Sequence, residues 1–142
     1  MVWQNLTEEE KGYFAGFLDG EGSIVISEYG NGYYRASMTI YNTDKETIEY
    51  LCKKLDYSID EGVDVRNDNR HNRNCYMFSI RRQDELLRFL KKLKPYLVTK
   101  KEQAEVAIEF LDEVVNRESH EYTDEKLEKL GELRQKMVKL NE

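Results

Sequence analysis

The sequence has only one proline and two cysteines among its 142 residues. Cys52 and Cys75 are too few for a disulfide framework and match no metal-ligand spacing, which is typical of a protein from a reducing compartment. No apolar run approaches the roughly 20 residues that are needed to span a membrane. The first ten residues also lack the basic and hydrophobic regions of a secretion signal. We therefore expect a protein that is not secreted and makes no membrane contact.

An excess of positive charge is missing as well, because the formal net charge is −6. Taken alone, this value argues against a nucleic-acid partner. However, the stretch from Arg66 to Arg82 contains five arginines and a single acid, Asp68. Electric fields fade over about 8 Å at physiological salt, so a local basic face can bind phosphates while remote acids are screened. We expect nonspecific DNA binding to be weaker than that of a basic protein.

The pattern along the chain predicts one α+β domain that covers residues 1–142, since no linker or low-complexity segment divides it. Thr7 and Glu10 form a capping box that opens the first helix, and Thr43 is expected to cap the second. Gly30-Asn31-Gly32 predicts a hairpin turn. The expected strands cover residues 23–29, 33–42, 62–67 and 73–81, and the later helices cover Asp44–Leu55, Gln83–Leu93, Thr99–Asn116 and Thr123–Leu140.

Alternation within the expected strands gives an antiparallel sheet with two different faces. One face is apolar enough to be covered by helices: Ile24, Ile26, Tyr34, Ala36, Met38, Ile40, Tyr76, Phe78 and Ile80. The opposite face mixes hydroxyls, arginines and aromatics, which suits the reading of base edges in a major groove. Its members are Val25, Ser27, Tyr29, Arg35, Ser37, Thr39, Tyr41, Asp64, Arg66, Cys75, Met77 and Arg81. Tyr13, Tyr34, Tyr50 and Tyr76 are expected at core-like positions.

Three glycines, Gly12, Gly16 and Gly20, recur every four residues in the first helix. They lie on one stripe of that helix. Each costs about 1 kcal/mol relative to alanine, so close packing against another backbone is the expected reason for them. The helix ends in Asp19-Gly20-Glu21-Gly22, where the helix dipole disfavours a carboxylate. An acid misplaced in this way beside a tightly packed seam suggests a metal site.

The nine residues Phe14-Ala15-Gly16-Phe17-Leu18-Asp19-Gly20-Glu21-Gly22 resemble the signature helix of the LAGLIDADG homing endonucleases. The element order also resembles the single-motif fold of that family. The resemblance implies an α-ββ-α-ββ-α core with a four-stranded antiparallel DNA-binding sheet and extra C-terminal helices. It further implies a metal-dependent, site-specific double-strand DNA endonuclease that acts as a homodimer.

The same resemblance assigns residues to the site. Glu21 is expected to be a catalytic metal ligand, with Gly20 beside it, and magnesium is the expected ion because it accepts few carboxylates together with waters and phosphate oxygens. Lys100 matches the lysine that supports the activated water, and Lys101 is its alternative by one register step. Asn42 and Asp44 are candidates for organising water. The dimer interface is expected at Gly12, Tyr13, Gly16, Phe17 and Gly20.

Asp19 lies two residues before Glu21, roughly 200° around the helix, so both acids are not expected to face one ion. It is expected to accept local hydrogen bonds at the helix end instead. DNA contacts are expected from the polar sheet face and the loop beyond it: Ser27, Tyr29, Arg35, Ser37, Thr39, Tyr41, Arg66, Arg70, Arg73, Cys75, Met77 and Arg81. His71, in that loop, is interpreted as a surface residue or a phosphate contact rather than a general base.

Two alternatives to the nuclease stay open from the sequence. One is an RNA-binding maturase that assists the splicing of an intron, with the intron RNA as its partner. The other is a DNA-binding protein that kept this fold and lost cleavage, although the acid retained at Glu21 favours the nuclease. The expected location is the cytoplasm of a prokaryote, associated with the nucleoid, or the interior of an organelle.

Overall fold

A computed structural model of the chain describes residues 6–30, 32–55, 63–68, 73–116 and 122–142, without the side chains of residues 63–68 and 73–75. The order of its helices and strands is the one expected from the sequence. The elements are α1 (Glu8–Glu21), β1 (Gly22–Glu28), β2 (Tyr34–Asn42), α2 (Lys45–Lys54), β3 (Val63–Asp68), β4 (Arg73–Ile80), α4 (Gln83–Leu93), the 3₁₀ turn η2 (Lys94–Tyr96), α5 (Lys101–Val115) and α6 (Asp124–Leu140).

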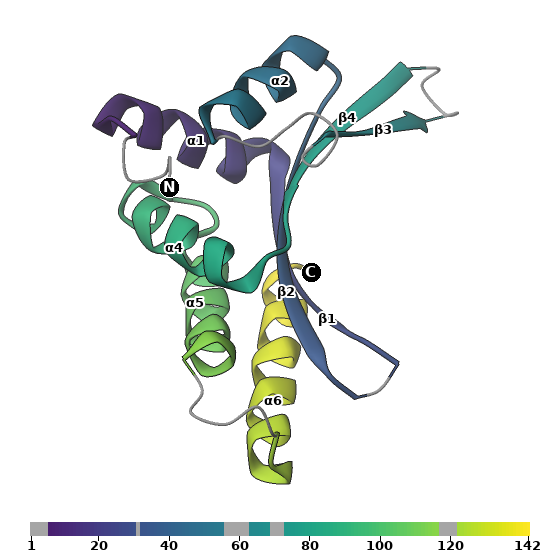
Figure 1. Cartoon of the computed structure of the whole chain (residues 1–142), viewed down its shortest axis with the longest axis vertical. Coiled ribbons are helices and arrows are strands. Elements are labelled where there is room, and N and C mark those ends of the chain that lie inside the picture. Colours follow the sequence, from purple (N-terminus) through teal and green to yellow (C-terminus); the bar gives the residue numbers. More distant parts are fainter. Residues whose placement is uncertain (1–5, 31, 56–62, 69–72, 117–121) are drawn as a thin grey trace.

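The strands form one antiparallel sheet in the order β1-β2-β4-β3. β1 and β2 make a hairpin whose turn contains Gly32 with a φ of 80°, a conformation that glycine adopts without strain. β2 pairs with β4 only from Met38 to Asn42. Figure 1 shows the described helices gathered on one side of the sheet, so none of them covers the other face.

The sheet face that the sequence assigned to the core is the covered one. Its aliphatic members and Phe78 are buried, and Tyr34 and Tyr76 are half-buried against the same cluster. The covering helices contribute the remaining core residues, which include Phe14 and Leu18 of α1, Phe89 of α4 and Phe110 of α5. This burial is the hydrophobic term that holds the helical layer on the sheet.

α1 runs directly into β1 at Gly22, which is both the C-cap of the helix and the first residue of the strand. A Cβ at this position would lie 2.6 Å from Cδ1 and 3.0 Å from the carbonyl oxygen of Leu18. Glycine is therefore required for the close connection. As a consequence, the end of the motif helix has a fixed place at the edge of the sheet.

Of three helix starts that the sequence predicted, one is confirmed and two are wrong. The capping box of Thr7 and Glu10 is confirmed by reciprocal hydrogen bonds of 3.1 and 3.0 Å. The expected cap at Thr43 is wrong, because Asp44 is the N-cap of α2, and its carboxylate accepts hydrogen bonds from the Glu46 N–H and the Thr47 hydroxyl. The expected start of α5 at Thr99 is also wrong, because α5 begins at Lys101 after an N-cap at Lys100.

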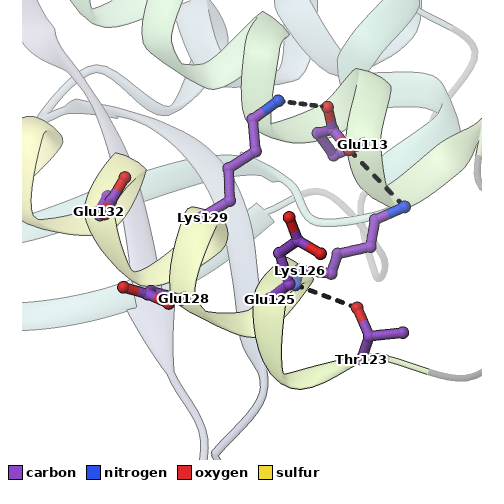
Figure 2. A pocket seen from close by; sticks show the side chains of 7 residues that line it. All are labelled: Glu113, Thr123, Glu125, Lys126, Glu128, Lys129 and Glu132. Atoms are coloured by element: carbon purple, nitrogen blue, oxygen red, sulfur yellow. Dashed lines mark hydrogen bonds and ion pairs between the residues drawn. The ribbon is translucent and has the colours of Figure 1, made fainter.

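Polar contacts hold α6 to the rest of the protein near its start and at its end. Near its start, the Glu113 carboxylate of α5 pairs with the ammonium groups of Lys126 and Lys129, at 3.6 and 2.6 Å (Figure 2). At its end, the Asn141 side chain donates to the carbonyl oxygen of Ile24 in β1 at 2.9 Å. None of the described helices has the length and apolar character needed to cross a membrane.

Candidate functional site

The glycine stripe of α1 lies on the surface of the chain. Gly12, Gly16 and Gly20 are exposed, and a Cβ placed on any of them would meet no atom within 4 Å. The opposite side of the same helix is buried through Phe14, Ala15 and Leu18. Nothing within the described part of the chain therefore requires glycine at these positions, and the stripe is free to pack against a second backbone.

Aromatic rings flank this stripe. Tyr13 lies 5.2 Å from Phe17 and 5.8 Å from Tyr50 of α2, measured between ring centroids. The expectation of a core position was wrong for Tyr13 and Tyr50, which are 46% and 42% exposed. Tyr13 lies outside the core because the buried side of α1 is filled by Phe14, whose ring packs against Phe89 of α4 at 5.9 Å. Tyr50 lies outside it because Ile48, Leu51 and Cys52 form the buried side of α2.

The two acids at the end of α1 have different surroundings. Glu21 is exposed. The Asp19 carboxylate accepts the backbone N–H groups of Val98 and Lys100, both at 2.9 Å. The expectation that Asp19 accepts hydrogen bonds at the helix end is confirmed, but its donors are 79 and 81 residues away in the sequence rather than local.

Lys100 returns to the same helix end through its side chain. Its ammonium group donates to the backbone carbonyl oxygen of Asp19 at 2.8 Å. The ammonium group of this lysine therefore lies against the C-terminal end of α1. The residue that it contacts there, Asp19, stands two positions before Glu21. Lys101, the register alternative, is the exposed first residue of α5.

The oxygen atoms at this helix end are suitable ligands for a hard cation. The Glu21 carboxylate and the carbonyl of Gly20 offer oxygen ligands of the kind that Mg²⁺ takes together with waters. Among the described residues, no group of three or more His, Cys, Asp or Glu side chains could hold a metal ion. The oxygen set of one copy therefore fits magnesium only as part of a larger site, which phosphate oxygens or a second copy would complete.

The side chains of Asn42 and Asp44 make hydrogen bonds with neighbouring residues in the sequence. The Asn42 side-chain oxygen accepts the N–H of Asp44 at 2.7 Å, and Asp44 caps α2. Their expected role in organising water stays a prediction. Both belong to the connection that carries the chain from β2 into α2.

The face of the sheet that carries no helix presents most of the polar residues singled out for DNA. Arg35 is exposed, and its guanidinium donates to the carbonyl oxygen of Arg81 at 3.1 Å. The hydroxyls of Thr39 and Ser79 lie 3.2 Å apart across β2 and β4. Exposed or half-exposed on the same hairpin are Ser27, Tyr29, Ser37 and Tyr41.

Met77 is the exception on this face, because it is only 3% exposed and has almost no surface to offer to a partner. Its expected DNA contact is therefore not supported by its burial. Of the remaining expected contacts, Arg66, Arg73 and Cys75 belong to β3 and β4, but their side chains lie outside the described residues, as does the whole of Arg70.

Cys52 is a buried structural thiol rather than a reactive group. It lies in the core on α2, and burial, aided by the nearby charge of Glu49, raises the pKa of its thiol to about 11. A thiol with so high a pKa is almost entirely protonated at neutral pH and is a poor nucleophile.

Gln83 was not singled out from the sequence, although its side chain pairs with the backbone of β2. Its amide oxygen accepts the N–H of Ala36 at 3.0 Å, and its amide nitrogen donates to the carbonyl of Ala36 at 2.8 Å. Gln83 thus takes the place of a strand partner where β4 has ended. A glutamine at the first position of a helix carries no distinctive signal in the sequence.

Comparison with protein families adds a family-level match. The model of the family described as LAGLIDADG endonuclease matches residues 14–108, which include α1 from Phe14 onward, the sheet and α5 as far as Ile108. The matched region contains Glu21 and Lys100. No curated protein sequence gives a significant match.

Solved structures share the fold. An archaeal intron-encoded homing endonuclease, I-Vdi141I complexed with DNA, superposes with a TM-score of 0.75 at 22% identity, over 95% of this chain and 86% of that one. The homing endonuclease I-CvuI, in complex with its target in the presence of 2 mM Ca, superposes with a TM-score of 0.71 at 23% identity, over 93% of this chain and 82% of that one. The meganuclease I-AabMI bound to uncleaved DNA superposes with a TM-score of 0.68 at 23% identity, over 87% of this chain and 43% of that one.

Proposed function

The chain belongs to the LAGLIDADG endonuclease family, and from this premise we propose that it is a homodimeric, site-specific homing endonuclease that hydrolyses both strands of DNA with the help of magnesium. The observation that carries the proposal is the position of Glu21, an exposed acid at the end of a helix whose exposed glycine stripe has no partner within the described chain.

Dimerisation follows from the properties of α1. Its exposed face combines small residues, which allow two backbones to approach closely, with the apolar surface of Tyr13 and Phe17. Packing two copies of this helix side by side would cover that surface and bring the two Glu21 carboxylates to one two-fold axis. A single Glu21 per chain is too little for a double-strand cut, so the dimer supplies the second.

Glu21 and the carbonyl of Gly20 would hold the ion. Bound magnesium would neutralise charge on the phosphate oxygens and make the attacking water more acidic. Glu21 would position the ion against the scissile phosphate, while the Lys100 ammonium would orient the attacking water and stabilise the negative charge that develops during hydrolysis.

The open sheet face supplies the surface for the target. The hydroxyls and arginines on β1 and β2 are suited to hydrogen bonds with base edges and phosphates, and a sheet ribbon fits the major groove. I-Vdi141I and I-AabMI are described with DNA and I-CvuI with its target, and none of the three with RNA. This supports DNA over the intron RNA of the maturase alternative.

The test begins with the target, because cleavage needs one. A plasmid pool with randomised sites is incubated with the protein in magnesium, and the linearised molecules are sequenced to find a preferred site. Glu21→Gln, which keeps the volume of the side chain and removes its charge, is then compared with the wild type on that site. Glu128→Gln, the same change at an exposed position of α6, is the matched control.

We expect Glu21→Gln to fold, dimerise and bind the site, but to lose at least 100-fold (order of magnitude) in cleavage rate, as is typical when a group that stabilises the transition state is removed. The control should cut like the wild type. Near-wild-type cutting by Glu21→Gln would overturn the assignment. Site-specific binding without any cleavage by the wild type would favour the inactive DNA-binding protein instead.

A further inference from the structure

Asp19 and Lys100 are joined by two hydrogen bonds, and Lys100 is the donor in both. The Asp19 carboxylate accepts the backbone N–H of Lys100 at 2.9 Å, and the Asp19 carbonyl oxygen accepts the Lys100 ammonium at 2.8 Å. The second carboxylate oxygen accepts the N–H of Val98, also at 2.9 Å. Asp19 therefore holds both the backbone and the side chain of the lysine.

Asp19 and Lys100 each place a group of favourable charge at the helix end of the other residue. α5 has no side-chain hydrogen bond at its N-cap, Lys100, and the Asp19 carboxylate lies there instead. α1 has no basic residue in its last turn, and the Lys100 ammonium lies against that turn. Anions stabilise helix N-termini and cations stabilise C-termini, so both placements are favourable.

The carboxylate also fixes the backbone of an exposed segment. Val98 is 83% exposed, and it lies between the buried Leu97 and the start of α5. The two hydrogen bonds from Asp19 span this segment on either side of Thr99. Without them, the backbone that carries Lys100 would be anchored mainly from Leu97 and from α5.

We propose that Asp19 is a positioning residue for the cleavage reaction, which acts through Lys100 by fixing the direction of its ammonium at the end of α1. This inference rests on the proposed nuclease function. Asp19 does not need to touch the metal ion for this role, since both of its carboxylate oxygens accept backbone N–H groups. A shift of about 1 Å in a catalytic group can cost about 100-fold in rate, so the orientation of the lysine matters.

The kinetic test uses a double-mutant cycle on the wild-type target site, under single-turnover conditions. The variants are Asp19→Asn, Lys100→Met and the double variant, with Asp112→Asn as the matched control, since Asp112 is a carboxylate of α5 that pairs with Lys91. We expect Asp19→Asn to cut about 10 to 100 times more slowly while binding the target within about twofold of wild type. The double variant should be no slower than Lys100→Met alone.

Two results of this cycle would overturn the proposal. If Asp19→Asn slows cleavage by the same factor whether or not Lys100 is present, Asp19 does not act through the lysine. If Asp19→Asn raises the magnesium concentration needed for half-maximal cleavage, Asp19 is a metal ligand. Asp19→Glu, which keeps the charge and the acceptor oxygens, should recover part of the rate and serves as the second variant if Asp19→Asn does not fold.

A second readout is independent of activity. Hydrogen exchange at the amide of Val98 or of Lys100 should speed up at least tenfold (order of magnitude) in Asp19→Asn, because asparagine keeps only one of the two acceptor oxygens. Both amides should stay slow in Lys100→Met, which leaves the Asp19 carboxylate in place. Unchanged exchange in Asp19→Asn would also refute the proposal. A wild-type protein that cuts no DNA would refute the nuclease function, whereas the exchange experiment would still report on the contact between Asp19 and the segment that carries Lys100.

Discussion

The amide group of Gln83 closes the free edge of β2 by pairing with both backbone groups of Ala36, at 3.0 and 2.8 Å. β4 pairs with β2 only as far as Met38, so the groups of Ala36 would otherwise face no strand. The same glutamine also donates to the carbonyl of Arg81, which in turn accepts the guanidinium of Arg35. The position of Arg35 on the open face is thus tied to a residue at the start of α4.

Gln83→Leu should destabilise the protein by about 1–3 kcal/mol, because it leaves the buried N–H and C=O of Ala36 without their partner. Urea denaturation measures this as a lower midpoint with an unchanged slope. Gln135→Leu, at an exposed position of α6, is the matched control and should change little. Equal midpoints for the two variants would show that the contact adds nothing to stability.

Gly16→Leu should separate the two subunits without unfolding them. In the single chain a Cβ at Gly16 meets no atom within 4 Å, so the exposed stripe has room for a larger side chain. Two closely packed helices would leave no such room. Sedimentation should report a folded monomer, and cleavage should be lost. Gly30→Leu makes the same change at an exposed glycine outside α1 and should leave the dimer intact. A well-folded wild-type monomer, even with DNA present, would contradict the prediction.

Reversing the charge of Arg66, Arg70 and Arg73 together should weaken DNA binding and flatten its salt dependence. Each lost phosphate contact lowers the slope of log K against log salt by about 0.9, so the change should approach three if all of them contact phosphates. The matched control reverses Lys91, Lys92 and Lys94, which belong to α4 and η2 in the helical layer. Unchanged affinity in the arginine variant would mean that DNA binds elsewhere.

The ion pair between α5 and α6 should give a small acid sensitivity. The hydrogen bond from the Lys129 ammonium holds the pKa of Glu113 below its ordinary value of 4.5 (Figure 2). A carboxyl whose pKa is lowered by folding contributes stability above its unfolded pKa and loses it as pH falls through the folded pKa. Because the pair lies at the surface, its contribution is expected at about 0.2–1 kcal/mol.

Thermal unfolding between about pH 6 and pH 3 measures this contribution. Glu113→Gln should be less stable than the wild type at the upper end of the range and should approach it at the lower end. Glu132→Gln, an exposed acid on α6 close to the same surface, is the control and should follow the wild type (Figure 2). A constant difference between wild type and Glu113→Gln across the range would contradict the assignment.

Local patterns in the sequence determined the elements and their faces. The capping box at Thr7, the alternation from Tyr34 to Asn42 and the glycine spacing of α1 each act within a few residues, where the period of the backbone decides which side chains share a face. The motif also placed Glu21 at a helix end and on the surface. Even the apolar face of the sheet followed from the period of two.

Tertiary structure decided which of these surfaces meet. The donors that reach Asp19 come from 79 and 81 residues away, and the partner of Gln83 lies 47 residues back in the chain. Tyr13 and Tyr50 were expected in the core and are exposed, because Phe14 fills the buried side of α1, and Ile48, Leu51 and Cys52 fill that of α2. Such outcomes depend on how packed elements share a limited volume, and no local period in the sequence records that competition.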